Sequence, residues 1–187
     1  ECGFRGGSCS APGRVLREFR AIWTGTEPDP HRAHAEFRQV NGDLDFAEMP
    51  LSADFSALLT GRAERRMHAD LRPDTDWLAQ YGVSYKTIAR NIVSQVIERN
   101  PAVPVINLMT HNHYDYRDES AGATQRLRIV FKELHEACAA AGVRAVGATL
   151  ADVADAVLAA PPVKEAFVSE GTVFEMTIGN AAGGGQS

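Results

Sequence analysis

Residues 84–122 read SYKTIARNIVSQVIERNPAVPVINLMTHNHYDYRDESAG, and this stretch sets the fold class. Ser84 is typical of a helix N-cap, and apolar residues then recur at helical spacing at Ile88, Ile92, Val93, Val96 and Ile97. The turn NPAVP ends that helix, and Val103–Met109 follows as a continuous apolar run of strand length. Such a run predicts a strand buried on both faces, followed by a polar loop over residues 110–122.

The chain beyond this stretch continues the alternation. A second helix is predicted from apolar residues at helical spacing, which are Leu127, Val130, Phe131, Leu134 and Cys138. Gly142 ends this helix, VRAVGA (143–148) predicts a short strand, and Thr149 begins a third helix that stops at two prolines. This order is typical of an α/β fold with parallel strands, whose functional loops follow the carboxyl ends of the strands.

The first half is less regular. Ser10 and Pro12 predict the start of a helix whose apolar face is formed by Val15, Leu16, Phe19, Ile22 and Trp23. Residues 24–35 predict a loop, 44–50 a short strand, and the segment up to residue 72 has no clear pattern. We expect one domain over 1–162, and a hairpin with a flexible tail over 163–187.

Composition excludes several classes of protein. The 187 residues carry a net charge of −5 and are 44% hydrophobic, which suits one globular domain and argues against a nucleic-acid partner. No apolar run is long enough for a membrane span, and no CxxC pair supports a zinc ribbon. Cys138 is expected to be a buried thiol, whereas Cys2 and Cys9 are either bridged or free. No signal peptide is visible. Because the chain does not begin with Met, we expect a processed product or a fragment, and a periplasmic or extracellular location stays possible.

His111 is the first candidate for chemistry, because it directly follows the apolar run. A histidine at the carboxyl end of a strand can be a general acid or base, a metal ligand, or an ordinary loop residue. His113 points to the opposite side if the backbone stays extended, so the two rings share one metal only if the loop turns between them. The tripeptide His-Asn-His alone does not indicate an HNH nuclease.

Three weaker motifs accompany it. FRGG (4–7) places Arg5 before two glycines, where a guanidinium can bind a carboxylate or a polar substrate group. HRAH puts His31 and His34 at a spacing that suits a metal only if the segment is helical, and its prolines favour a loop. DLRPDTDW (70–77) is an acidic loop that ends in Trp77 and is either a binding face or simply solvated.

Together, GFRGGSCS near the start and INLMTHN about a hundred residues later resemble two motifs of the polysaccharide deacetylase family. Members often have FRAGG at one strand end and a histidine of the form NLxLHS at a later one. The segment AGVRAVGATLADVADAV is similar to the family's last strand and helix. The resemblance implies part of a distorted (β/α) barrel and hydrolysis of N- or O-acetyl groups on a poly- or oligosaccharide.

The resemblance also implies roles for individual residues. His111 would be the general acid that protonates the leaving amine or alcohol, and Arg5 would hold a catalytic aspartate. His113, Tyr114 and Trp77 would contact the acetylated saccharide. A divalent metal, zinc in particular, would polarise the acetyl carbonyl and activate water.

The family's Asp-Asp pair and its HxxxH-type histidine pair precede the arginine motif, and this chain has no room for them before Arg5. We therefore expect no metal ligands here: no trio converges among His31, His34, His68, His111, His113 and His135. The resemblance covers the C-terminal part of such an enzyme, whose missing N-terminal half would be a partner. The alternatives are a divergent, non-catalytic carbohydrate-binding or structural α/β domain, and an unrelated His-dependent α/β hydrolase.

Overall fold

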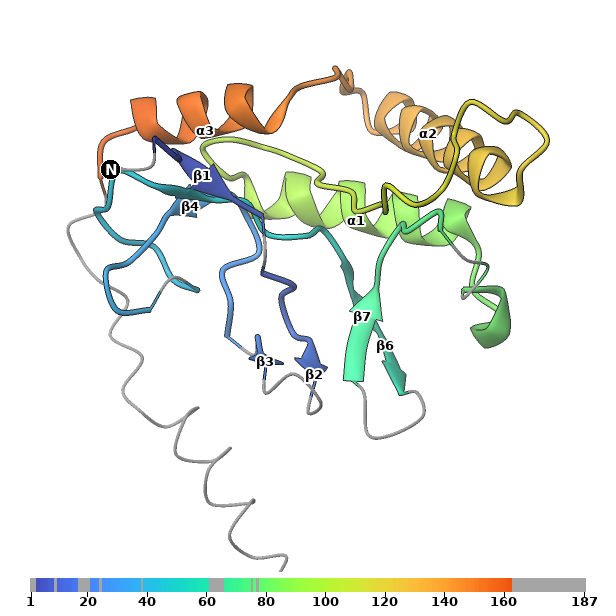
Figure 1. Cartoon of the computed structure of the whole chain (residues 1–187), viewed down its shortest axis with the longest axis horizontal. Helices are drawn as coiled ribbons and strands as arrows, with labels where there is room; N and C mark the ends of the chain where they lie inside the picture. The colour runs from blue at the N-terminus through green and yellow to red at the C-terminus, as the bar shows by residue number, and fades with distance from the viewer. Residues whose placement is uncertain are drawn as a thin grey trace, which may run out of the picture.

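The computed structural model describes residues 3–8, 10–16, 21–23, 25–37, 39–60, 66–74, 76 and 78–162. These residues form a mixed α/β structure with small sheets and with the helices α1 (Tyr85–Arg99), α2 (Gly122–Ala140) and α3 (Leu150–Ala159). In Figure 1 the three helices lie along one side, and two β-hairpins extend from the other. A short 3₁₀ turn, η3 (Ala79–Tyr81), precedes α1. The hairpin and tail expected over 163–187 lie outside the described residues, so that division into domains stays a prediction.

The strands form two small sheets rather than a continuous parallel one. The first sheet has the order β1 (Gly6–Gly7), β5 (Ala47–Glu48), β4 (His31–Arg32), and its β1–β5 pair is parallel, with Gly6 opposite Ala47. The second sheet is antiparallel and has the order β3 (Ala21–Ile22), β2 (Val15–Leu16), β7 (Arg66–Ala69), β6 (Asp54–Thr60). Parallel pairing is thus present between β1 and β5, and a closed barrel is not seen in the described residues.

The predicted helix ends in the second half are confirmed. The Ser84 hydroxyl accepts the backbone N–H of Thr87 at 3.2 Å and caps α1. Thr149 and Asp152 form a reciprocal capping box at the start of α3. Gly142, with φ of +71°, follows the end of α2 in the left-handed conformation that a helix C-terminus favours.

The helix predicted to begin at Pro12 is wrong. Val15 pairs with Ile22 across the antiparallel strands β2 and β3 instead. Gly13 has φ of +73°, which turns the chain before β2, and the Ser10 hydroxyl donates to the buried carboxylate of Glu48 at 2.8 Å rather than capping a helix. Residues 15–16 and 21–22 of the predicted helix are therefore paired antiparallel strands.

Three further expectations about strands changed. The segment without a clear pattern contains the β6–β7 hairpin, whereas β5 lies inside the strand expected over 44–50. The strand predicted over Val103–Met109, buried on both faces, is wrong, because these residues have no assigned strand and are partly buried or exposed. Residues 143–148 also form no strand and are mostly exposed.

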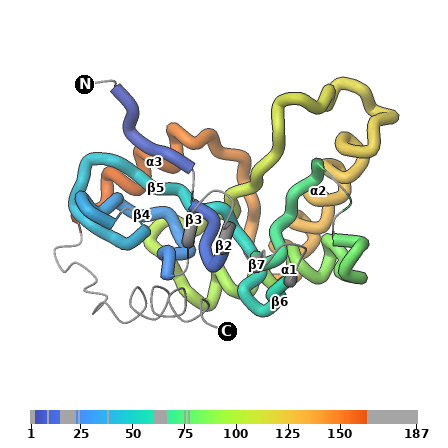
Figure 2. Tube along the Cα trace, turned by 60° about the horizontal axis from the view of Figure 1, so that its bottom comes forward, coloured from blue at the N-terminus to red at the C-terminus, as the bar shows by residue number. Residues whose placement is uncertain are grey.

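Two apolar clusters hold these elements together. Helix α1 packs on α2 and on β6, and its core includes Ile88, Ile92, Val130 and Leu134 together with residues of β6 and β7. Helix α3 covers the first sheet through a second cluster that includes Met49, Val153 and Val157. Figure 2 shows the same division, with α3 beside β4 and β5 and with α1 beside β6 and β7.

Cys138 is buried in the first core and forms no disulfide, as predicted, and burial raises the pKa of its thiol. Cys2 and Cys9 lie outside the described residues, so their pairing stays open. Among the helices that the structure describes, none is both long and apolar enough to span a membrane.

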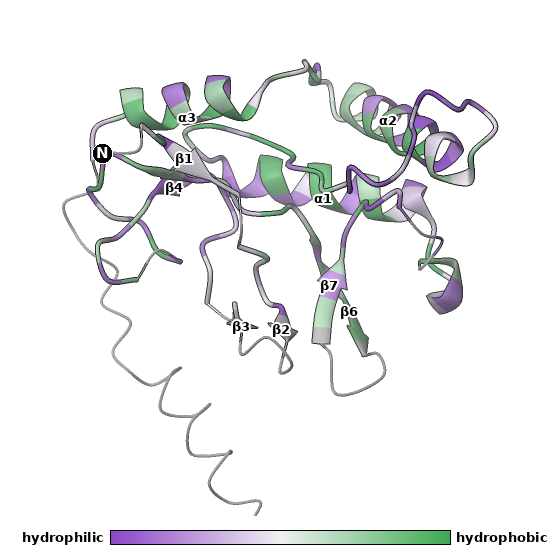
Figure 3. Ribbon diagram, viewed as in Figure 1, coloured by the Kyte–Doolittle hydropathy of each residue, from purple (hydrophilic) through white to green (hydrophobic). Residues whose placement is uncertain are grey.

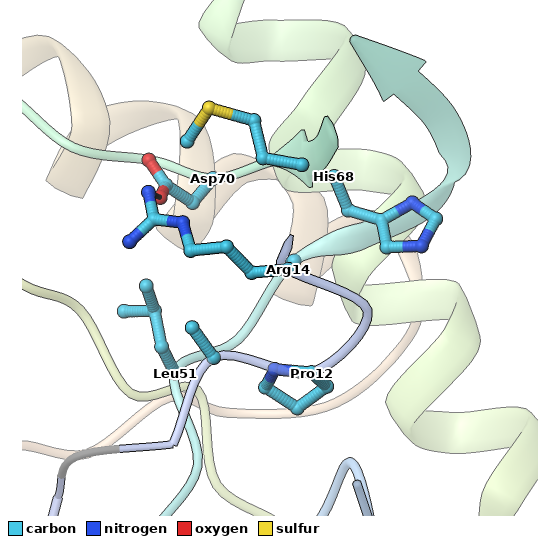
Figure 4. A pocket seen from close by; sticks show the side chains of 8 residues that line it. Pro12, Arg14, Leu51, His68 and Asp70 are labelled. Atoms are coloured by element: carbon cyan, nitrogen blue, oxygen red, sulfur yellow. Dashed lines mark ion pairs between the residues drawn. The ribbon is translucent and has the colours of Figure 1, made fainter. Parts of the chain in front are cut away.

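A cavity of about 10 Å³, with room for one water molecule, lies between the turn at residues 12–13 and β7. Figure 4 shows the guanidinium of Arg14 directed toward the buried carboxylate of Asp70 at this cavity. Arg72 also contacts Asp70, at 3.0 Å. Burial raises the pKa of Asp70 despite both arginines. The cavity is far too small to hold a sugar.

Candidate active site

The segment that leads to His111 is anchored by Asn107. The backbone N–H of Ser52 donates to the Asn107 carbonyl at 3.0 Å, and the Asn107 N–H donates to the Ser52 hydroxyl at 2.9 Å. The Asn107 amide also donates to the carbonyls of Met49 and Pro50 and to the hydroxyl of Ser8. These bonds fasten the segment beside the chain that follows β5, so the residues after Asn107 start from a fixed point.

A buried carboxylate, Asp74, receives the residues that come next. Its Oδ1 accepts from the Thr110 hydroxyl at 2.7 Å, from the Tyr116 hydroxyl at 2.9 Å and from the His111 backbone N–H at 3.2 Å. Its Oδ2 contacts Nδ1 of the His111 ring. The Thr110 and Tyr116 hydroxyls also contact each other. Asp74 thus links the start of the loop that carries His111 to its middle, at Tyr116.

The charge on Asp74 settles the state of the histidine ring. Burial opposes ionisation of Asp74, but hydrogen bonds from Thr110, His111 and Tyr116 outweigh it and hold the pKa of this carboxyl below its ordinary value. An ionised carboxylate only accepts hydrogen bonds, so Nδ1 of His111 carries the proton in this pair. Nε2 is then the nitrogen left to exchange a proton with a substrate.

The Tyr116 hydroxyl is a further donor to the Asp74 carboxylate. Burial raises the pKa of its hydroxyl, and the hydrogen bond to Asp74 acts in the same direction. The hydroxyl therefore stays protonated and keeps donating to the carboxylate at neutral pH.

The side chains of Asp74 and His111 differ in solvent exposure. The Asp74 side chain is 3% exposed, whereas the His111 side chain is 46% exposed. The loop around His111 is the hydrophilic stretch between α1 and α2 in Figure 3. A ring fixed at one nitrogen and open to solvent at the other is suited to acid–base catalysis.

Aromatic rings continue the site along the loop. The His111 and His113 ring centroids are 5.3 Å apart, and those of His113 and Tyr114 are 4.2 Å apart. Tyr114 and Tyr116 follow at 6.3 Å. The expectation that His111 and His113 diverge is wrong, because the chain turns at residues 112 and 113 and the alternation of an extended strand does not apply.

The described contact of Arg5 is with α3 and not with the loop that carries His111. It directly precedes β1, and its guanidinium pairs with Asp155 of α3, both side chains being largely exposed. Its role toward a catalytic carboxylate stays a prediction. Trp77, the third expected saccharide contact, lies outside the described residues.

His31 and His34 each have contacts of their own. His31 is buried in β4, where its Nδ1 lies 2.8 Å from the carbonyl of Asp29. Nδ1 of His34 accepts the backbone N–H groups of Glu36 and Phe37, so HRAH is not helical. In the described part of the chain, no three His, Cys, Asp or Glu side chains are grouped so that they could hold a metal ion.

The sequence interpretation overlooked Asp74, which it treated only as one acidic residue of DLRPDTDW. Asp74 and His111 are 37 residues apart, and spacing of that length carries no information about contact. The available signal was the position of Asp74 after Arg72-Pro73, since a proline favours an extended or turning backbone that can present a side chain.

Comparisons of this chain with protein-family models, with curated proteins and with solved structures found no match.

Proposed function

We propose that this chain carries the acid-catalytic part of a metal-dependent carbohydrate deacetylase, which removes N- or O-acetyl groups from a poly- or oligosaccharide. The observation that carries this proposal is the contact between buried Asp74 and half-exposed His111. The motifs FRGG and INLMTH support the same class of enzyme. On this proposal, the described residues are part of a distorted (β/α) barrel.

The role of His111 follows from the orientation of its ring. Nδ1 donates to Asp74, so Nε2 faces the substrate. In its charged form the ring transfers the Nε2 proton to the leaving amine or alcohol as the bond to the acetyl carbon breaks, and it retains the Nδ1 proton. Asp74 keeps the ring from rotating or changing tautomer, which preserves the geometry that proton transfer requires.

The metal and the catalytic base are a separate part of the proposal. Among the described residues, no three His, Cys, Asp or Glu side chains are grouped to hold a metal ion. We propose that a preceding N-terminal half of the same enzyme supplies the divalent metal, zinc in particular, and the carboxylate that Arg5 would hold. The proton-transfer role of His111 does not depend on where those ligands lie.

Binding of the saccharide is assigned to the rings next to His111. His113 and Tyr114 lie in contact on the loop, and aromatic faces suit the apolar faces of sugar rings. Trp77, in the same segment as Asp74, is proposed to add a third ring. These rings also favour the second candidate, a carbohydrate-binding domain without catalysis, because binding requires the rings and not the Asp74–His111 pair.

Acetate release tests the proposal. The polypeptide that includes the N-terminal half, supplied with zinc, is incubated with acetylated chitin oligosaccharides or acetylated xylan. The present chain alone should release no acetate even with zinc, and His111→Ala should lower the kcat of the longer polypeptide about 10²–10⁴-fold.

His135→Ala is the matched control, since His135 is an exposed histidine on α2 away from the loop, and it should leave the rate unchanged. Near-normal turnover by His111→Ala would contradict the assignment. Saccharide binding without acetate release by the longer polypeptide would favour the binding domain.

A further inference from the structure

The loop that carries Asp74 is held by a side chain from a different element. Arg126 of α2 donates its Nε–H to the carbonyl of Pro73 and an Nη2–H to the carbonyl of Asp74, each at 2.8 Å. A guanidinium presents these donors in a rigid plane, so two bonds to successive carbonyls fix the direction of the peptide between them. Arg126 therefore sets where the backbone of Asp74 lies.

A third carbonyl of the same loop is held from α1. The Tyr85 hydroxyl donates to the carbonyl of Arg72 at 3.1 Å. Burial raises the pKa of Tyr85, so this hydroxyl remains a donor at neutral pH. Residues 71–74 form no helix or strand, and these side-chain bonds take the place of a ladder there.

The first turn of α2 leaves room for this arrangement. A Cβ added at Gly122 would lie 3.0 Å from Nη1 of Arg126, closer than an ordinary van der Waals contact. A Cβ at 122 would require the guanidinium to shift by a few tenths of an ångström. The glycine and the arginine therefore act together at the start of α2.

We propose that Arg126 is the positioning residue of the Asp74–His111 pair. It touches neither the ring nor the carboxylate oxygens, and it acts by fixing the backbone from which the Asp74 carboxylate reaches Thr110, His111 and Tyr116. Helix α2 thereby joins the loop before α1 to the loop after it. The effect of Arg126 on a reaction rate rests on the proposed deacetylase function, whereas its effect on the histidine ring does not.

The test is the tautomer of His111, measured by ¹⁵N NMR of the ring in the present chain. In the wild type the neutral ring should carry its proton on Nδ1. In Arg126→Met it should return to the mixed tautomers of an unrestrained imidazole, and the carboxyl ¹³C signal of Asp74 should titrate at a higher pH than in the wild type. Arg126→Lys should show an intermediate effect, since an ammonium cannot span two carbonyls in a plane.

Arg128→Met is the matched control. Arg128 lies on the same helix, and its guanidinium pairs with exposed Glu119 at 2.6 Å, so its loss should change neither signal. Gly122→Ala keeps Arg126 itself. It should lower the fraction of the His111 ring that is protonated at Nδ1, as Arg126→Met does, but by less. It also serves if Arg126→Met does not fold.

The proposal is overturned if Arg126→Met folds and its His111 tautomer is unchanged. If Arg126→Met does not fold, an unchanged tautomer in Gly122→Ala overturns it instead. In the longer polypeptide, Arg126→Met should lower kcat about 10- to 100-fold, as expected for a small displacement of a catalytic group. A changed tautomer in a polypeptide that releases no acetate from any substrate would refute the deacetylase function and leave the positioning role intact.

Discussion

Asp54 and Asp74 are both buried aspartates with several hydrogen-bond donors, yet they serve different regions of the molecule. Asp54, at the start of β6, accepts from Ser56 and from the side-chain amides of Asn91 and Gln95 on α1. Asp74 accepts from two hydroxyls and from a histidine ring on a surface loop. Burial opposes ionisation of each carboxyl, and hydrogen bonds nevertheless hold each pKa below its ordinary value.

The difference lies in what the donors can do. Amides and the Ser56 hydroxyl do not titrate near neutral pH, so the Asp54 group only fastens β6 to α1. The Asp74 group instead includes the half-exposed His111 ring, whose type of side chain can act as an acid or base. A buried carboxylate is therefore a structural anchor in one region and, on the proposed function, a support for acid–base chemistry in the other.

The largest expected effect separates the two carboxylates by activity. Asp74→Asn should lower the kcat of the longer polypeptide about 10²–10⁴-fold, because an amide cannot accept from Thr110, Tyr116 and His111 as the carboxylate does and would favour the other tautomer. Asp54→Asn should change kcat little. Equal losses of kcat in both folded variants would end the distinction between anchor and catalytic support.

The next effect separates them by stability. Asp54→Ala should lower the free energy of unfolding by about 1–3 kcal/mol, since it removes the acceptor of the partly buried Asn91 and Gln95 amides. Urea unfolding of the present chain measures this change. Asp118→Ala removes an exposed carboxylate that accepts only from its own loop, and it should cost much less.

The pH dependence of stability should be similar for the two, and its sign follows from the lowered pKa values. Each carboxyl stabilises the folded state above the unfolded-state pKa near 3.8, and this contribution is lost as the pH falls through the lower folded-state pKa. Urea unfolding between pH 2 and pH 6 should therefore show a shallower acid decline in Asp54→Asn and in Asp74→Asn. An unchanged decline in either variant would mean that its carboxyl is not stabilised as an anion.

The smallest effect concerns the rings beyond the pair. Tyr114→Ala should weaken binding of an acetylated oligosaccharide by about 0.5–1.5 kcal/mol, the scale of one aromatic contact, with kcat nearly unchanged. Isothermal titration of the longer polypeptide measures this directly. Tyr81→Ala is the control, since Tyr81 is an exposed tyrosine in η3. The same affinity in wild type and Tyr114→Ala would remove Tyr114 from the saccharide site.

The helices were predictable from the sequence because their signals are local. Capping residues such as Ser84 and Thr149, and apolar residues every three or four positions, act within one or two turns. The hairpins were not, because Val15 and Ile22 fit a helix face and a strand pair equally well. Strand pairing depends on partners distant in sequence, as with β2 and β7.

At the site, the sequence by itself pointed to His111, His113 and Tyr114 through the abrupt end of an apolar run. Only the tertiary structure showed that Asp74 meets His111, that a turn brings His113 beside it, and that Arg126 holds the Asp74 backbone. Capping and periodicity are properties of neighbours along the chain, so the sequence determines them. The partner of a buried carboxylate is determined by which loops two packed helices bring together.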